Sequence, residues 1–179
     1  FCVHGDLVVQ GRTVDDLNVL TRVVGIEGDL LVHENPGLKK FPDMPALEYV
    51  GGGISISANA ELERVSGFPS LERLGGGLYI GENPKLEQFA FGERTATIDS
   101  LFFGLNERMV AFYADFEHVT RDVTFSDNAA LKTINMPELR EVGGNFHINK
   151  NVTLHTATVP RLRSVGGIWQ FSGNDSITE

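Results

Sequence analysis

The sequence predicts a mostly all-β solenoid of about eight short coils, and two recurring patterns lead to this prediction. Asparagine returns at a step of 22 to 24 residues, and apolar residues return in phase with it; the asparagines are Asn35, Asn59, Asn83, Asn106, Asn128, Asn151 and Asn174. A repeat of this length cannot enclose a core by itself. Neighbouring copies must therefore stack and bury their apolar faces against one another.

Each coil is predicted to contain a short strand that ends just before its asparagine. Apolar residues stand five and three positions before the asparagine, and a spacing of two places both on one face of a strand. The first of these rows is Leu30, Ile54, Leu78, Leu101, Val123, Phe146 and Trp169, and the second is Val32, Ile56, Ile80, Phe103, Phe125, Ile148 and Phe171. We expect both rows to point inward, and the residues four and two positions before the asparagine to point outward.

The remainder of each coil is predicted to turn through corners and to form about three short sides. Apolar residues recur three and six positions after the asparagine, beginning with Leu38 and Phe41. Gly-Gly pairs at 51–52, 75–76, 143–144 and 166–167 permit a tight backbone turn before the next strand. The asparagine amide can bond backbone groups that the bend leaves unpaired, so we interpret the seven asparagines as a structural ladder and not as ligand groups.

Three coils depart from the pattern. In the first coil Arg12 stands where the others have asparagine, and residues 13–20 predict a short helix with Thr13 as N-cap that covers the end of the stack. Coils four and five, over residues 89–119, lack the proline and the glycine pair and are rich in aromatic residues. We expect their back side to have a different shape. No capping pattern follows Asn174, which predicts an exposed stack end or a following segment.

The stretch Gly-Asp-Leu-Leu-Val-His-Glu-Asn-Pro-Gly-Leu at 28–38, followed by Phe-Pro-Asp-Met-Pro-Ala-Leu-Glu-Tyr-Val-Gly-Gly at 41–52, resembles the receptor L domain. This family includes the ligand-binding L domains of the insulin and epidermal growth factor receptors. The resemblance implies a single-stranded right-handed β-helix with a leucine-rich-repeat-like interior, spanning residues 1–179 as one domain of a longer chain. It also implies an extracellular or cell-surface location. True leucine-rich repeats are similar, but they place the next leucine two residues after the asparagine, whereas this chain places it three residues after.

The charge of the chain and the length of its apolar runs exclude some classes of partner. The chain has 15 basic and 24 acidic side chains and a net charge of −9, which argues against nucleic acid or an anionic membrane as the main partner. No apolar run is long enough to span a bilayer, so direct membrane insertion is not expected. Cys2 is the only cysteine, and the resembled family often pairs a cysteine at this place. No cofactor is implied.

The outward strand positions are the expected binding surface. The row four positions before the asparagine is Leu31, Ser55, Tyr79, Phe102, Thr124, His147 and Gln170. Tyr79 and Phe102 fall on adjacent coils beside Gly81 and Gly104, and rigid aromatic groups ringed by small ones are typical of a protein-binding hot spot. We therefore predict a noncatalytic recognition or adhesion module that binds a protein or glycan ligand, with Leu31, Tyr79, Phe102, Thr124, His147 and Gln170 as contact residues. The alternative is that the two aromatic residues pack against an adjacent domain of the chain or a back-side excursion of coils four and five.

Two other functional classes compete with recognition. A structural spacer of a cell-surface or wall assembly would make its contacts at stack ends and back loops. A carbohydrate-active β-helix enzyme would need a reactive constellation, and the best one is Ser126 with His147 and either Asp122 or Asp127. The support for such a triad is weak, because exposed serines also stand two positions before the asparagine in other coils, at Ser57 and Ser172.

Carboxylate pairs, metal sites and glycosylation have weaker support. Glu34, Glu82 and Asp127 share a row two coils apart, so roughly 10 Å separates successive members, which is marginal for a carboxylate pair. His33 and His147 lie five coils apart and cannot share a metal. The sequons at Asn151 and Asn174 use ladder asparagines, so we interpret them as chance matches.

Overall fold

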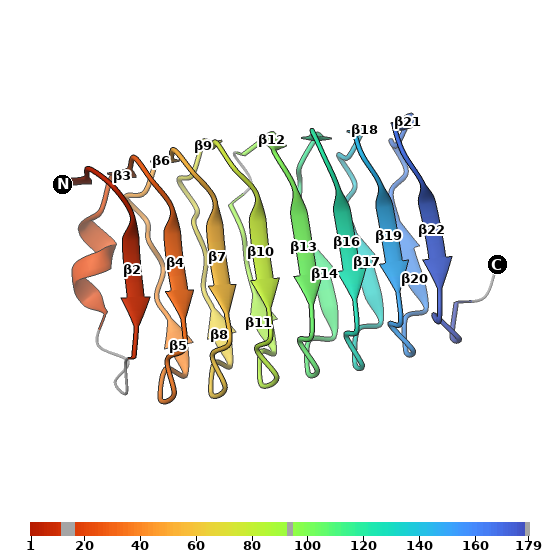
Figure 1. Cartoon of the computed structure of the whole chain (residues 1–179), viewed down its shortest axis with the longest axis horizontal. Helices are drawn as coiled ribbons and strands as arrows, with labels where there is room; N and C mark the ends of the chain where they lie inside the picture. The colour runs from red at the N-terminus through yellow and green to blue at the C-terminus, as the bar shows by residue number, and fades with distance from the viewer. Residues whose placement is uncertain (12–16, 93–94, 178–179) are drawn as a thin grey trace.

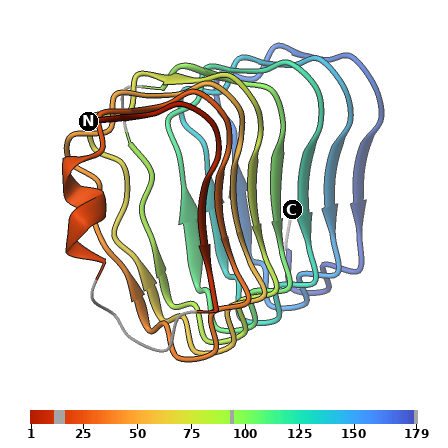
Figure 2. The same cartoon turned by 60° about the vertical axis from the view of Figure 1, so that its left-hand side comes forward.

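The computed structural model describes residues 1–11, 17–92 and 95–177. In this part of the chain, short coils follow one another along a single axis and form an all-β parallel solenoid (Figure 1). Each coil runs along one flat side and then closes around a narrow interior (Figure 2). The stacking predicted from the asparagine period is confirmed.

The flat side is a continuous parallel sheet, which we call the front sheet. Its strands occur in chain order and pair in register, so residues equivalent by the asparagine period lie side by side; Tyr79, for example, pairs with Phe102. The eight strands enclose seven complete turns and are β2 (Leu7–Gln10), β4 (Leu30–His33), β7 (Ile54–Ser57), β10 (Leu78–Gly81), β13 (Leu101–Gly104), β16 (Val123–Ser126), β19 (Phe146–Asn149) and β22 (Trp169–Ser172).

The second wall follows the asparagine corner and consists of two separate parallel sheets. The first sheet contains β5 (Lys40–Phe41), β8 (Arg64–Val65) and β11 (Gln88–Phe89). The second contains β14 (Ala111–Tyr113), β17 (Thr133–Asn135) and β20 (Thr156–Thr158). The wall is thus interrupted between coils four and five, where the sequence predicts a differently shaped back side.

The third wall precedes the next front strand and is also divided, between the strands that lead into β10 and β13. Its first sheet contains β1 (Cys2–Val3), β3 (Gly25–Ile26), β6 (Tyr49–Val50) and β9 (Arg73–Leu74). Its second sheet contains β12 (Thr97–Ile98), β15 (His118–Val119), β18 (Glu141–Val142) and β21 (Ser164–Val165). The front sheet alone runs unbroken through all the coils.

The interior is filled by the inward rows predicted from the sequence. Leu78, Ile80 and Leu86 of one coil are almost completely buried, and their equivalents repeat this from the second coil to the seventh. Aromatic rings fill the interior beside the wall break, where Phe103 lies 5.0 Å from Phe112 between ring centroids. In β22, the last strand, the inward-row side chains of Trp169 and Phe171 are about half exposed.

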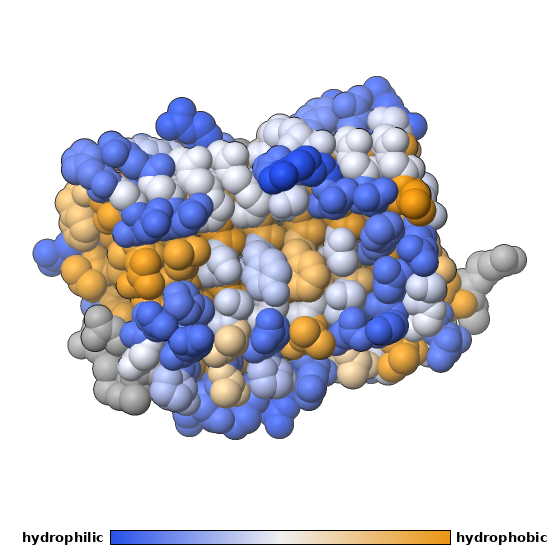
Figure 3. All heavy atoms as spheres, in the orientation of Figure 1, coloured by the Kyte–Doolittle hydropathy of each residue, from blue (hydrophilic) through white to orange (hydrophobic). Residues whose placement is uncertain are grey.

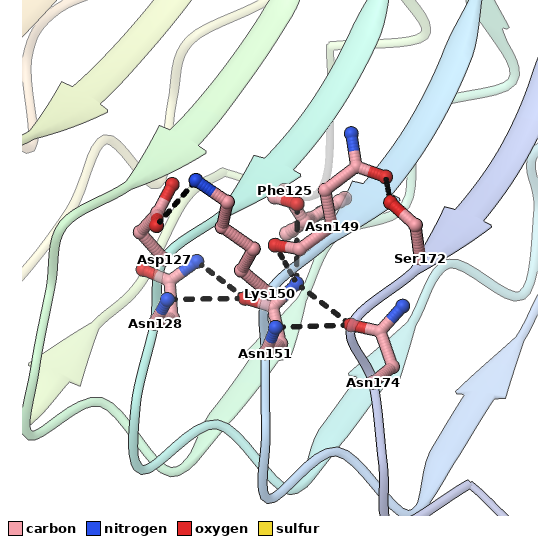
Figure 4. Close-up of polar contacts among 8 residues, drawn as sticks. All are labelled: Phe125, Asp127, Asn128, Asn149, Lys150, Asn151, Ser172 and Asn174. Atoms are coloured by element: carbon pink, nitrogen blue, oxygen red, sulfur yellow. Dashed lines mark hydrogen bonds and ion pairs between the residues drawn. The ribbon is translucent and has the colours of Figure 1, made fainter.

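The asparagines form the expected ladder inside the corner after each front strand (Figure 4). The side chain of Asn151 donates to the carbonyls of Phe125 and Asn149 at 3.1 and 3.0 Å. Its own oxygen accepts from the backbone and side-chain nitrogens of Asn128 at 3.2 and 3.0 Å. The backbone nitrogen of Asn151 donates in turn to the side-chain oxygen of Asn174 at 3.0 Å. Asn151 therefore bonds its own corner and the coils on either side.

The ladder is needed because the backbone at each corner takes an uncommon conformation. The residue before each asparagine has a positive φ of 53° to 57°, in Glu34, Ala58, Glu82, Leu105, Asp127 and Lys150, and Gly173 has 63° in the last corner. This left-handed turn ends the front strand and leaves backbone groups without strand partners. The asparagine amide supplies those partners.

Leu105 is the least suitable of these residues for a left-handed turn, because its branched side chain crowds the backbone there and 45% of it is exposed. We expect Leu105→Gly to raise the free energy of unfolding by about 0.5 kcal/mol, the relief of strain exceeding the added flexibility of the unfolded chain. Urea denaturation measures the difference. The control is Val152→Gly, at an exposed turn position without positive φ, which should lower stability.

A second row of side-chain acceptors, which the sequence analysis missed, stands where the front strands begin. A carboxylate oxygen of Asp6 accepts from the backbone nitrogen of Asp29 at 2.8 Å, and Asp29 accepts from Gly53 at 2.6 Å. In later coils the carboxylate of Asp122 accepts from the backbone nitrogen of Asn145 at 2.6 Å. These side chains join neighbouring coils at the opposite end of the strands from the asparagine ladder.

The capping helix predicted over residues 13–20 is wrong in type and extent. Its proposed N-cap, Thr13, lies outside the described residues, and the described part is a short 3₁₀ helix, η1 (Asn18–Arg22). This helix lies on the side of the first coil opposite β2 and belongs to the wall of that coil (Figure 2). Leu17, Leu20 and Val23 are buried at a spacing of three, which matches three residues per 3₁₀ turn and not the 3.6 of an α-helix.

Candidate functional site

Tyr79 and Phe102 form a stacked aromatic pair on the outward face of the front sheet. Their ring centroids are 4.6 Å apart and their planes differ by 7°. The rings lean over the glycines two residues further on, since a Cβ atom at Gly81 would lie 2.8 Å from Tyr79 Cε1, and one at Gly104 would lie 2.7 Å from Phe102 Cζ. Glycine at both positions therefore lets the two rings lie along their strands.

The orientation of the pair follows from the spacing of the strands. The centroid separation is close to the distance of about 4.8 Å between neighbouring strands, so the rings stack along the solenoid axis. The ring edges consequently face solvent, and each ring turns its other face toward a small neighbour, Ser55 beside Tyr79 and Thr124 beside Phe102. Burial raises the pKa of the Tyr79 hydroxyl, and the carboxylate of Glu82 adds to this shift. The hydroxyl is thus kept protonated and able to donate a hydrogen bond.

The structure brings all six predicted contact residues into one row. Strand register places Leu31 beside Ser55, which lies beside Tyr79, and the row then continues through Phe102, Thr124, His147 and Gln170. The surface of the front sheet is most hydrophobic over β2 and β4 and paler over the middle strands (Figure 3). The row begins with Val8, which is 48% exposed and pairs with Leu31. The sequence analysis missed Val8, although it stands one residue from the inward Leu7 and Val9 in the same alternating pattern.

The polar residues of the proposed triad are not joined in the described structure. Ser126 is paired in register with Asn149, whereas His147 is paired with Thr124. His147 Nε2 is buried and has no hydrogen-bond partner. The carboxylate of Asp122 is bonded to the backbone of the next coil, as described above. Asp127 instead lies 3.7 Å from the ammonium of Lys150.

The row of carboxylates at the corners is tied into local interactions. Glu34 accepts a hydrogen bond from the side chain of Gln10 at 2.8 Å, and the carboxylate of Asp127 faces Lys150. Glu82 is exposed. Across residues 1–11, 17–92 and 95–177, no group of three or more histidine, cysteine or acidic side chains is placed to hold a metal ion.

The two sequons differ in accessibility. Asn151 is completely buried and its amide is fully engaged in the ladder. Asn174 is half-buried, and its side chain donates to the carbonyl of Ile148 at 2.6 Å. Both asparagines therefore have structural bonds that a glycan would have to displace. Cys2 is an exposed free thiol.

Protein-family models, curated proteins and solved structures were each compared with the chain, and none of them matches it. In the described part of the chain, no helix has the length and apolar character required to cross a bilayer. The findings therefore establish a parallel β-solenoid with an asparagine ladder, whose most distinctive surface feature is the outward row on the front sheet.

Proposed function

We propose that the protein is a noncatalytic recognition module that binds a protein or glycan ligand on its front sheet. The observation that carries the proposal is the stacked Tyr79–Phe102 pair, which is half-buried on a flat and continuous strand surface. Aromatic groups held rigidly by neighbouring glycines lose little conformational freedom when a ligand binds. The same ring surfaces can pack against apolar protein side chains or against the C–H faces of sugars.

The surroundings of the pair support a ligand-sized contact. Ser55 and Thr124 flank the rings and leave their outer faces uncovered by large side chains. The walls of coils four and five lie behind the front sheet and do not fold over it (Figure 2). A back-side excursion as the partner of the two rings is therefore disfavoured.

The test compares the wild-type chain with Tyr79→Ala/Phe102→Ala on arrays of glycans and of extracellular proteins. We expect a ligand of the wild-type chain to bind the double variant about 30-fold more weakly, the loss of about 2 kcal/mol that is typical of a hot spot. Phe1→Ala is the control, because Phe1 is an exposed aromatic residue, at 59%, away from the front sheet.

Unchanged binding of an identified ligand to the double variant would contradict the proposal. Weak binding to many partners that is unaffected by the Tyr79→Ala and Phe102→Ala changes would favour a structural spacer of a surface or wall assembly. If the wild-type chain cleaved a polysaccharide and His147→Ala abolished this activity, the result would favour a carbohydrate-active enzyme.

The finer architectural assignment is part of the same proposal. We infer a right-handed β-helix of the receptor L-domain type, located outside the cell or on its surface. The support is the residue pattern quoted above, together with the observed order of front strand, asparagine corner and glycine-paired corner in successive coils.

A further inference from the structure

A seam runs between coils four and five on the second wall. Backbone bonds join β11 to β8, with Gln88 N donating to Glu63 O at 3.2 Å. Backbone bonds also join β17 to β14, with Thr133 N donating to Val110 O at 3.3 Å. No backbone hydrogen bond joins β11 to β14 within the described residues. The seam therefore leaves two strand edges without backbone partners. The other neighbouring strands of this wall are joined to each other by hydrogen bonds along these edges.

The repeat shows which groups are left open at the seam. By the repeat, the nitrogen of Ala111 corresponds to that of Thr133, and the carbonyl of Glu87 corresponds to that of Val110. These are therefore the donor and the acceptor that do not bond each other across the seam. Across the seam the two coils still touch through their side chains, because the rings of Phe89 and Phe112 lie 6.1 Å apart between centroids with planes that differ by 11°. The two strands at the seam are thus joined by side-chain packing and not by backbone hydrogen bonds.

A cavity of about 480 Å³ lies on the surface along the seam. Phe89 and Ala90 line it from coil four, and Met109, Val110 and Ala111 line it from coil five. Asp43 and Arg64 contribute charged groups on the side of the earlier coils. The cavity therefore combines open backbone edges, an apolar floor and charges of both signs.

On the coil-five edge of the seam, outward side chains are apolar at positions where the other coils of this wall carry polar ones. Val110 is 48% exposed, and the equivalent position in the other coils is charged or histidine, namely Lys39, Glu63, Glu87, Lys132 and His155. Ala90 and Ala111 are exposed beside it. Exposed apolar side chains next to open strand edges are the features that recruit an added strand.

We propose that the seam binds an extended segment of a partner polypeptide, which adds a strand along the β11 or β14 edge. Main-chain donors and acceptors of the segment complete the open edges, and alternate apolar side chains pack on Phe89 and Val110. A glycan lacks the regular donor and acceptor spacing of a peptide backbone, so a peptide fits this site better. The seam lies on another wall from the Tyr79–Phe102 pair and is independent of the function proposed for that pair.

The open edge itself is tested by hydrogen exchange of the free protein. We expect the amide of Ala111 to exchange at least about tenfold faster than that of Thr133, the equivalent residue one coil later, because only the latter is bonded across the wall. Equal protection of the two amides would show that the seam is closed and would overturn the proposal.

Binding is tested with a displayed library of random peptides of about ten residues, the length of a long strand. Peptides are selected on the wild-type chain and their dissociation constants are then measured for variants. Ala111→Pro removes the open donor without removing a bond of the fold, so we expect at least about tenfold weaker binding, a loss of about 1.4 kcal/mol. Ala111→Ser and Tyr79→Ala/Phe102→Ala should bind as the wild type does.

A second arm leaves the protein unchanged in case Ala111→Pro disturbs the fold. The selected peptide is N-methylated at alternate residues, which removes its donors on one edge while keeping its side chains. Loss of binding for one of the two methylation registers supports strand addition. Binding that survives both registers, or a selection that yields no peptide sensitive to Ala111→Pro, overturns the proposal. Self-association of the chain that Ala111→Pro abolishes would assign the seam to a second copy and would also overturn it.

Discussion

Replacing Phe103 with alanine is expected to lower the free energy of unfolding by about 4 kcal/mol, the usual cost of emptying an aromatic site in a core. Phe103 is completely buried in β13, and its ring lies against those of Phe89, Phe112 and Phe125 at centroid distances of 6.2, 5.0 and 6.0 Å. These rings fill the interior where the second wall is interrupted. On that wall no backbone pairing joins β11 to β14, so ring packing holds these two coils together there. Urea denaturation followed by circular dichroism measures the loss.

The matched control for this change is the preceding residue. Phe102 has the same side chain on the same strand but points to the opposite face, where it is only half-buried. Phe102→Ala should therefore cost much less stability while weakening ligand binding. A similar loss of stability in both variants would contradict the inward and outward assignment of the strand.

Asn83→Ala should be comparably damaging, at about 4 kcal/mol, although it removes a polar group. The buried side chain donates to the carbonyls of Ile56 and Gly81 at 3.0 and 2.9 Å, and to the side-chain oxygen of Asn106 at 3.3 Å. It also accepts two bonds from Asn59, at 3.2 and 3.1 Å. Alanine leaves these partners buried and unpaired, and each unpaired group costs about 1 to 3 kcal/mol before the structure relaxes. Thermal and urea unfolding both report the change.

Asn135→Ala provides the comparison for the ladder. Asn135 is half-buried on β17, outside the corners, and its side chain makes no hydrogen bond with the described residues. Its replacement should change stability by less than about 0.5 kcal/mol. If both asparagine variants were equally stable, the ladder would be incidental to the fold.

The repeating interior could be predicted because each row combines a period of two with a fixed distance from an asparagine. That distance identified the inward residues Leu78 and Ile80 and the outward Tyr79 in one step. The burial of Trp169 was predicted less accurately, because its position in the inward row says nothing about what lies beyond the last strand. It is inward in register and yet half exposed.

Other features depend on information that the repeat does not contain. Spacings of three in the first coil fit a 3₁₀ turn as well as a short α-helix, and backbone bonds from Leu20 N to Leu17 O and from Val23 N to Leu20 O decide between them. The acceptor row that includes Asp29 is hard to find from sequence, because glycine and serine replace the acidic residue in the middle coils. The aromatic content of coils four and five indicated an altered back side. Only the structure shows that β11 and β14 are not paired there.

The unbroken front sheet has a consequence for how such a chain can change in length. Its strands stay in register even though successive asparagines are separated by 22, 23 or 24 residues, so the back walls absorb every difference in coil size. Duplicating or deleting one whole coil would move the later strands of the front sheet by one strand spacing, about 4.8 Å, and leave the remaining rows aligned. The reach of the outward surface can thus be set in discrete steps, independently of the residues that define its chemistry.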